Sequence, residues 1–217
     1  MRFDCATELD AGVEAAVAAL RDGALVVLPT DTVYGIAADA FDATAVAGLL
    51  RAKGRGRDMP PPVLIAEPAT LDALVAERPP LWLQTMLDDL WPGPLTVVFR
   101  AQPSLTWDLG ETHGTVAVRV PDDDRTRAVL RQAGPSAVSS ANLSGQPAAT
   151  SVDEAETMLG ESVRVYLDGG PTTGATPSTI LDVTGPVPRV LRQGAIDLAT
   201  LHAYNNTIEP AGGGAGA

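Results

Sequence analysis

The segment Arg51 to Arg57, RAKGRGR, gathers four of the chain's 15 basic residues within seven positions. It contains Lys53, the only lysine in the sequence. Glycines between the cations let the backbone approach an anion closely, while lysine supplies a point charge and arginine a planar fork that suits phosphate. Lys53 and Arg55 are therefore candidate phosphate ligands. The alternative is a solvated loop at a helix C-terminus, where the helix dipole also favours cations.

Two further polar segments follow short apolar runs that are typical of buried strands. The sequence TDTVYG, from Thr30 to Gly35, follows the run at 24–28, and SSANLSG, from Ser139 to Gly145, follows Ala137 and Val138. Ligands of open α/β sheets bind at the carboxyl ends of strands, so these hydroxyl and amide side chains are candidate ligand contacts. The alternative for each segment is an ordinary turn.

Two arginines lie in segments that are otherwise apolar. Alternation in TVAVRVP (115–121) places Arg119 on the same side of a predicted strand as Ala117. A buried arginine needs an acidic partner, so Arg119 either binds a carboxylate or phosphate of a substrate or forms a structural ion pair. Arg192, between Leu191 and Gly194, presents the same two alternatives.

Composition and motifs exclude several classes of function. The formal net charge of −12 opposes broad nucleic-acid binding, and the single cysteine rules out an internal disulfide. Neither His113 nor His202 has metal-binding or triad spacing, and neither the P-loop nor the dinucleotide fingerprint is present. Because the chain start is acidic and the apolar runs are short, we expect a soluble cytoplasmic protein without a signal peptide or membrane span.

Alternating patterns predict an α/β protein with a twisted, open, mixed sheet flanked by helices. We expect one catalytic domain over 1–203 and a flexible tail over 204–217, of which 212–217 is only glycine and alanine. The best-supported helix begins after Ser151, which forms a capping-box pair with Glu154. The predicted helices are 11–22, 42–52, 69–77, 81–90, 124–133, 152–159 and 197–203. The predicted strands are 24–28, 62–66, 95–100, 115–120, 136–140, 164–168, 178–183 and 188–191.

Taken together and in order, these segments resemble the YrdC-like family of threonylcarbamoyl-AMP synthases, over about residues 10–195. The resemblance rests on seven segments in register: PTDTVYG (29–35), KGR (53–55), WPGPLTVVF (91–99), VAVRVP (116–121), SSANLSG (139–145), PSTILD (177–182) and VLRQG (190–194). It implies a YrdC-like fold that forms threonylcarbamoyl-adenylate and pyrophosphate from ATP, L-threonine and bicarbonate, for threonylcarbamoyl modification of tRNA adenosine.

The resemblance also implies roles for individual residues. Thr32 and Tyr34 would contact threonine or its carbamate, Arg119 the threonine carboxylate and Ser178 the carbamoyl end. Lys53 and Arg55 would act catalytically by binding phosphates and bicarbonate. ATP would further be held by Thr115, Ser140, Asn142, Thr150 and Arg192. Mg²⁺ would arrive with ATP without protein ligands of its own. Expected partners are the proteins that transfer the threonylcarbamoyl group, with a weak contact to tRNA.

The sequence departs from the family pattern at two positions near this site. Met59 stands where asparagine is common, and Leu64 lies in the strand where many members have a histidine. A third departure is the run Asp122 to Asp124 after Pro121. Two other functions stay open. One is an RNA-binding module whose cavity holds backbone phosphates. The other is a relative that binds a nucleotide but performs no threonine chemistry.

Overall fold

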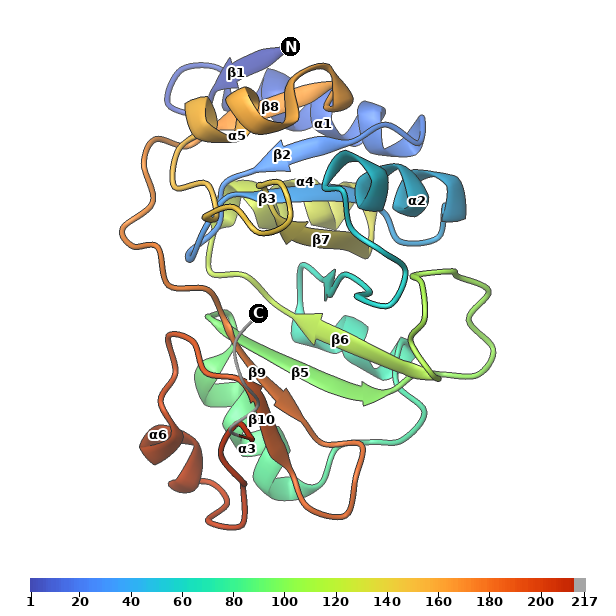
Figure 1. Cartoon of the computed structure of the whole chain (residues 1–217), viewed down its shortest axis with the longest axis vertical. Coiled ribbons are helices and arrows are strands. Elements are labelled where there is room, and N and C mark those ends of the chain that lie inside the picture. The colour runs from blue at the N-terminus through green and yellow to red at the C-terminus, as the bar shows by residue number, and fades with distance from the viewer. Residues whose placement is uncertain (213–217) are drawn as a thin grey trace.

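A ten-stranded mixed sheet runs through the computed structural model, which describes residues 1–212 (Figure 1). Its strand order is β1-β8-β2-β3-β7-β4-β6-β5-β9-β10, with parallel and antiparallel neighbours. The mixed sheet that the sequence predicts is thereby confirmed. The strands are β1 (Arg2–Asp4), β2 (Val26–Leu28), β3 (Gly35–Asp39), β4 (Val63–Leu64), β5 (Leu95–Arg100), β6 (Thr115–Arg119), β7 (Ser136–Ser140), β8 (Val165–Asp168), β9 (Thr179–Asp182) and β10 (Arg189–Arg192).

Helices cover both faces of the sheet around β2. Helices α1 (Leu9–Arg21) and α4 (Asp124–Ala133) pack with Val26 and Leu28, whereas α2 (Ala43–Ala52) and α5 (Val152–Leu159) pack with Val27. Successive strand residues point to opposite faces, so a strand covered twice must be apolar throughout. This coverage explains why the run at 24–28 contains no polar residue.

Only one face is covered around β5, β6 and β9. Leu95 and Val97 lie in a core with α3 (Leu81–Leu90), the 3₁₀ helix η1 (Pro68–Ala73) and α6 (Leu198–His202). Thr96 and Val98 point to the opposite face and line a cavity instead. The change from a doubly covered to a singly covered sheet therefore leaves an open face in the middle of the molecule.

Side-chain caps fix the starts of two helices as the sequence predicts. Asp42 accepts hydrogen bonds from the amides of Thr44 and Ala45 ahead of α2. Ser151 accepts from the amide of Glu154 at 3.3 Å ahead of α5, but the carboxylate of Glu154 turns to the amide of Thr150 at 2.7 Å. The side chain of Glu154 therefore bonds to the residue before the N-cap, and this contact holds Thr150 in place.

Three predictions about the elements need correction. Strands β1 and β3 were not expected, and the predicted helix at 69–77 is the shorter 3₁₀ helix η1. The segment from 204 is not wholly a flexible tail, because Ile208 is buried and Glu209 forms an ion pair with Arg189. Residues 213–217 lie outside the described part of the chain. Among residues 1–212 no helix has the length and apolar character needed to cross a membrane.

Candidate active site

A cavity of about 500 Å³ occupies the open face of the sheet around β5, β6 and β9. Thr96, Val98, Ala117 and Ile180 form its floor. Both predicted polar segments contribute to its walls, because β2 and β7 each run antiparallel to β3 and so end at the same edge. The wall residues are Thr30, Thr32, Val33, Tyr34, Gly35, Pro60, Pro61, Pro62, Val138, Ser139, Ser140 and Asn142.

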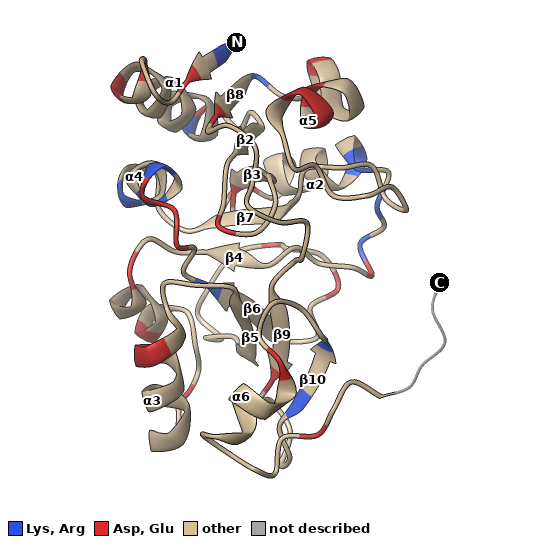
Figure 2. Ribbon diagram, turned by 90° about the vertical axis from the view of Figure 1, so that its left-hand side faces the viewer, with Lys and Arg blue, Asp and Glu red and all other residues tan. Residues whose placement is uncertain are grey.

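Three arginines from distant parts of the sequence meet at this cavity: Arg55, Arg119 and Arg192. Burial lowers the pKa of each guanidinium, and the charges of Arg119 and Arg55 lower that of Arg192 further. Arg192 therefore lies close enough to both Arg119 and Arg55 for their charges to repel its own. Acidic residues lie on the outer helices α3 and α5, whereas β6 and β10 carry basic residues (Figure 2). The cavity is thus a local cationic site in a chain of net charge −12.

Arg119 lies on the same side of β6 as Ala117, as its alternating pattern predicts. Its Nη2 atom lies 2.5 Å from Oδ1 of Asp31, its Nε donates to the Gly93 carbonyl and its Nη1 donates to the Thr32 hydroxyl. The structural ion pair is therefore present, although Arg119 also lines the cavity. The other carboxylate oxygen of Asp31, Oδ2, is buried and has no hydrogen-bond partner among residues 1–212. No local sequence pattern indicates this partner, which lies 88 positions away from Arg119.

Lys53 lies behind the cavity wall rather than in its lining. Its side chain is 2% exposed, and its Nζ donates to the carbonyl oxygen of Ser140 at 2.5 Å, to that of Asn142 at 2.7 Å and to Asn142 Oδ1 at 3.3 Å. Burial and the neighbouring charge of Arg55 lower the pKa of Lys53 to about 8. All three ammonium protons therefore have partners in the turn that follows β7.

Arg55, two positions further on, faces the cavity. Its Nη1 donates to the hydroxyl of Ser139 at 3.0 Å, and its Nε is buried without a partner. Because Gly54 has a φ of 61°, the backbone turns between the two cations and aims them in different directions. The solvated-loop alternative is therefore wrong for Lys53 and Arg55.

The structure brings most of the other predicted site residues to the cavity. Ser178 lines it, with its Oγ 2.9 Å from Thr96 Oγ1 and within reach of Arg192 Nη2. Thr150 is the exception, since it is absent from the lining and its hydroxyl donates to Glu154. The predicted site residues in the lining are Thr32, Tyr34, Arg55, Thr115, Arg119, Ser140, Asn142, Ser178 and Arg192.

The two departures from the family pattern differ in position. Leu64 is buried and lines the cavity, whereas Met59 is 44% exposed and lies outside the lining. Leu64 therefore contributes an apolar side chain to the cavity wall, and Met59 is outside the lining.

No group of three His, Cys, Asp or Glu side chains within 1–212 is placed to hold a metal ion. The donors that face the cavity are cations, hydroxyls and amides, which suit an anion. A divalent cation fits this site when it arrives on the phosphates of a nucleotide.

Comparison with known proteins agrees with this geometry. A family model for Sua5, YciO and YrdC proteins, described as "Telomere recombination", matches residues 18–194. A Bacillus subtilis threonylcarbamoyl-AMP synthase is 36% identical over 92% of this chain and 58% of its own length. A Mycobacterium leprae protein, provisionally given the same name, is 52% identical over 92% of this chain and 91% of its own.

The structure of Pyrococcus abyssi Sua5 complexed with L-threonine superposes with a TM-score of 0.89 at 31% identity. The match covers 97% of this chain and 62% of the archaeal one, so the chain spans about three-fifths of that protein. The fold and these matches define a class of α/β proteins, and the chain presents a cationic cavity on the open face of its sheet. The chain belongs to the Sua5/YciO/YrdC family.

Proposed function

We propose that this chain is a threonylcarbamoyl-AMP synthase, which joins L-threonine, bicarbonate and ATP into threonylcarbamoyl-adenylate and releases pyrophosphate. The observation that carries the proposal is the convergence of Arg55, Arg119 and Arg192 on one cavity. A triphosphate and a carboxylate together carry enough negative charge to balance the three guanidinium groups. The likeness to a relative complexed with L-threonine supports threonine as one of the substrates.

Threonine would bind at the Arg119 end of the cavity. Arg119 has five N–H groups, of which three are used by protein acceptors, so two are left for a substrate carboxylate. Thr32 lies beside Arg119 and Ser178 beside Arg192, so hydroxyl groups would lie on both sides of a substrate bound here. The unpartnered Oδ2 of Asp31 keeps a negative charge close to Arg119.

The nucleotide would bind along the wall formed by Ser140 and Asn142, with Thr115 at the base of β6 and Thr150 behind the wall. Arg55 and Arg192 would neutralise the phosphates directly. Lys53 would add its charge from behind the same wall, where its ammonium holds the backbone of Ser140 and Asn142. Bicarbonate would meet the threonine amine between Arg55 and Arg192.

The reaction needs cations more than a protein base. The neutral threonine amine adds to bicarbonate with loss of water and gives a carbamate. A carbamate oxygen then forms a bond to the α-phosphorus as the bond from that phosphorus to the bridging oxygen breaks, and pyrophosphate leaves. The anionic carbamate approaches the anionic triphosphate, and anionic pyrophosphate departs. Fixed guanidinium groups would stabilise the negative charge at each of these stages. Mg²⁺ bound to the phosphates would supply further charge neutralisation.

The proteins that receive the product and any direct contact with tRNA stay predictions from the family resemblance. A cytoplasmic location fits an enzyme whose product is an intermediate in tRNA modification. The product is a reactive mixed anhydride, so it must be passed to an enzyme that transfers the threonylcarbamoyl group to adenosine.

Pyrophosphate release from ATP tests this function. We expect release only when L-threonine, bicarbonate and Mg²⁺ are all present, and loss of release when EDTA removes the metal. Release that persists without threonine would contradict the proposal. Calorimetric binding of ATP without binding of threonine would instead favour a nucleotide-binding relative, and salt-sensitive retention of tRNA without ATP would favour the RNA-binding module.

A further inference from the structure

Residues 169–178, here called the strap, connect β8 to β9 across the sheet (Figure 1). These strands are second and ninth in the strand order, so seven inter-strand spacings separate them. Seven spacings of about 4.8 Å amount to about 34 Å in a flat sheet. The eleven steps from Asp168 to Thr179 reach about 36–40 Å when fully extended. The strap is therefore a short connection for this separation, and few residues link its start to its end.

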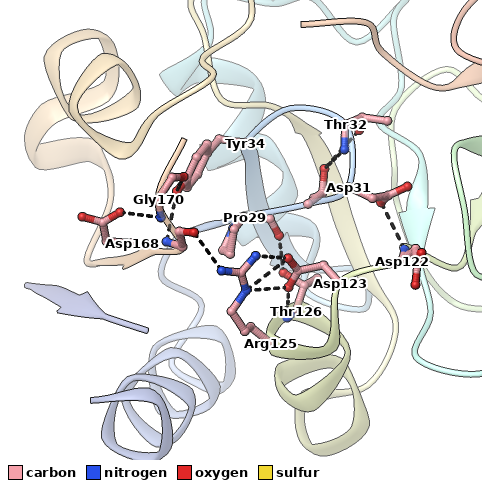
Figure 3. A network of polar contacts seen from close by, with 12 residues as sticks. Pro29, Asp31, Thr32, Tyr34, Asp122, Asp123, Arg125, Thr126, Asp168 and Gly170 are labelled. Carbon is pink, nitrogen blue, oxygen red and sulfur yellow. Dashed lines mark hydrogen bonds and ion pairs between the residues drawn. The ribbon is translucent and has the colours of Figure 1, made fainter. Parts of the chain in front are cut away.

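The start of the strap is held by side chains from three places in the chain (Figure 3). The hydroxyl of Tyr34 donates to the carbonyl of Gly170 at 2.6 Å and accepts from the amide of Gly169 at 3.0 Å. Arg125 Nη1 donates to the carbonyl of Gly169 at 2.8 Å, and Asp168 Oδ1 accepts from the amide of Gly170 at 3.0 Å. Both amides and both carbonyls of the two glycines therefore have partners.

Both positions at this anchor require glycine. A Cβ on Gly169 would lie 2.6 Å from Arg125 Nη1 and 2.7 Å from Pro29 Cβ, and Gly170 has a φ of 78°. Arg125 is itself fixed by Asp123, the N-cap of α4, at 2.5 Å. Through Arg125, these contacts link the start of the strap to the N-terminus of α4.

The far end of the strap carries a predicted substrate contact. The carbonyl of Ser178 accepts from Arg192 Nη2 at 2.7 Å, and its hydroxyl lies 2.9 Å from that of Thr96. Between the ends, the amide of Thr172 donates to the carbonyl of Thr150 at 2.8 Å. The strap therefore joins residues on both sides of the cavity, and it ends at Ser178, whose carbonyl is bonded to Arg192.

We propose that Tyr34 is a positioning residue, whose hydroxyl anchors the start of the strap and so holds Ser178 and Arg192 at the cavity, rather than a hydroxyl ligand of the substrate. The ring of Tyr34 is fully buried and forms part of the cavity wall, while its single hydroxyl proton is given to Gly170. Burial raises the pKa of Tyr34 to about 12, so the hydroxyl stays a donor at neutral pH. The effect on turnover rests on the function proposed above.

Tyr34→Phe removes only the hydroxyl, and Tyr166→Phe is its matched control. Tyr166 is also buried, and its hydroxyl donates to the carbonyl of Gly160 at 2.7 Å, away from the strap. Amide hydrogen exchange over residues 169–178 should be about tenfold faster in Tyr34→Phe than in wild type and unchanged in Tyr166→Phe. Saturating threonine should slow this exchange again, and kcat/KM for threonine should fall about tenfold in Tyr34→Phe alone.

The comparison of exchange between the variants and wild type uses protein without substrates, so it tests the anchor even if pyrophosphate release fails to occur. Unchanged strap exchange in Tyr34→Phe would overturn the proposal, and a raised KM for threonine with unchanged exchange would assign the hydroxyl to direct substrate binding. Arg125→Lys provides a second test, since it keeps the charge beside Asp123 but shortens the reach to Gly169. It should raise strap exchange in the same direction, and its failure to do so would also contradict the anchor.

Discussion

Lys53 and Arg55 are separated by one glycine, yet their side chains have different surroundings. Lys53 holds the turn after β7 with all three of its N–H groups, whereas Arg55 faces the cavity with its Nε free. Side-chain type alone suggests the same phosphate role for both. Lys53 therefore holds the backbone of the cavity wall in place, whereas Arg55 is the cation that faces the cavity.

Replacing each cation by methionine tests this difference. In Lys53→Met, the carbonyl oxygen and Oδ1 of Asn142 lose their donor, so the free energy of unfolding should fall by about 1–3 kcal/mol. Arg55→Met should change it by less than about 0.5 kcal/mol while lowering kcat/KM at least about a hundredfold. Denaturant unfolding and steady-state kinetics of both variants provide the measurement. A stable Lys53→Met beside an unstable Arg55→Met would contradict the assignment.

The pKa of Lys53 leads to a prediction about stability and pH. Below about pH 8 both the folded and unfolded chains carry the ammonium, so the cost of burying it is present in full. Between about 8 and the ordinary value of 10.5, the folded chain loses a proton that the unfolded chain keeps. The contribution of Lys53 to the free energy of unfolding should therefore rise with pH, by about 1 kcal/mol per unit. A difference between wild type and Lys53→Met that stays flat from pH 8 to 10 would contradict it.

Sequence patterns placed single residues on faces but did not pair them. Alternation in 115–121 put Arg119 beside Ala117, because that inference needs only the period of a strand. It could not find Asp31, whose contact depends on how the ends of β2 and β6 meet in the folded sheet. Tyr34 is a similar case, because nothing local indicates that its hydroxyl binds Gly169 and Gly170.

Among the elements, the β5–β6 connection (101–114) closes one side of the cavity with Leu109 and Thr112. Arg57 joins this connection to the basic segment 51–57. The carbonyl of Arg57 accepts from the amide of Glu111 at 2.8 Å, and its guanidinium pairs with Asp108. Trp107 of the same connection stacks on Phe41, with ring centroids 5.5 Å apart. These contacts bring the connection over the segment that contains Arg55.

Gly110→Ala tests the importance of that closure. Gly110 has a φ of 108°, and a Cβ there would lie 2.7 Å from the carbonyl oxygen of Arg57. The variant should lose about 1–3 kcal/mol of stability and bind ATP more weakly, because the connection must move away from Arg57. Gly114→Ala is the control, since it has a φ of 77° but open space around a Cβ. Equal ATP affinities in the two variants, measured by calorimetry, would contradict a role for the closure.

The types and bounds of helices and strands could be predicted where apolar periodicity and the flanking prolines or glycines indicated the same element. Helix α3 and strands β5 and β7 match their predicted ranges, since apolar periodicity and flanking prolines or glycines define them. Strand β3 was missed because its small residues follow the polar TDTVYG segment, although the apolar run Ile36 to Ala38 was a usable signal. The helix at 69–77 became 3₁₀ because tertiary packing of Leu71 and Leu74 outweighs local propensity.

For the whole molecule, the sheet order decides where chemistry can occur. The half around β2 is covered by helices on both faces, and the half around β5 leaves a face open. Basic residues that are far apart in the sequence meet there, in a molecule whose net charge is −12. This arrangement lets one small site attract ATP while the rest of the surface repels polyanions.

The identity of the product tests the central claim most directly. Protein incubated with ATP, Mg²⁺, L-threonine and ¹³C-bicarbonate should form an adenylate that contains both threonine and the labelled carbon, as detected by mass spectrometry, with one pyrophosphate released for each adenylate. Pyrophosphate release accompanied by unlabelled threonyl-adenylate, or by AMP alone with no labelled intermediate trapped at short times, would contradict the account.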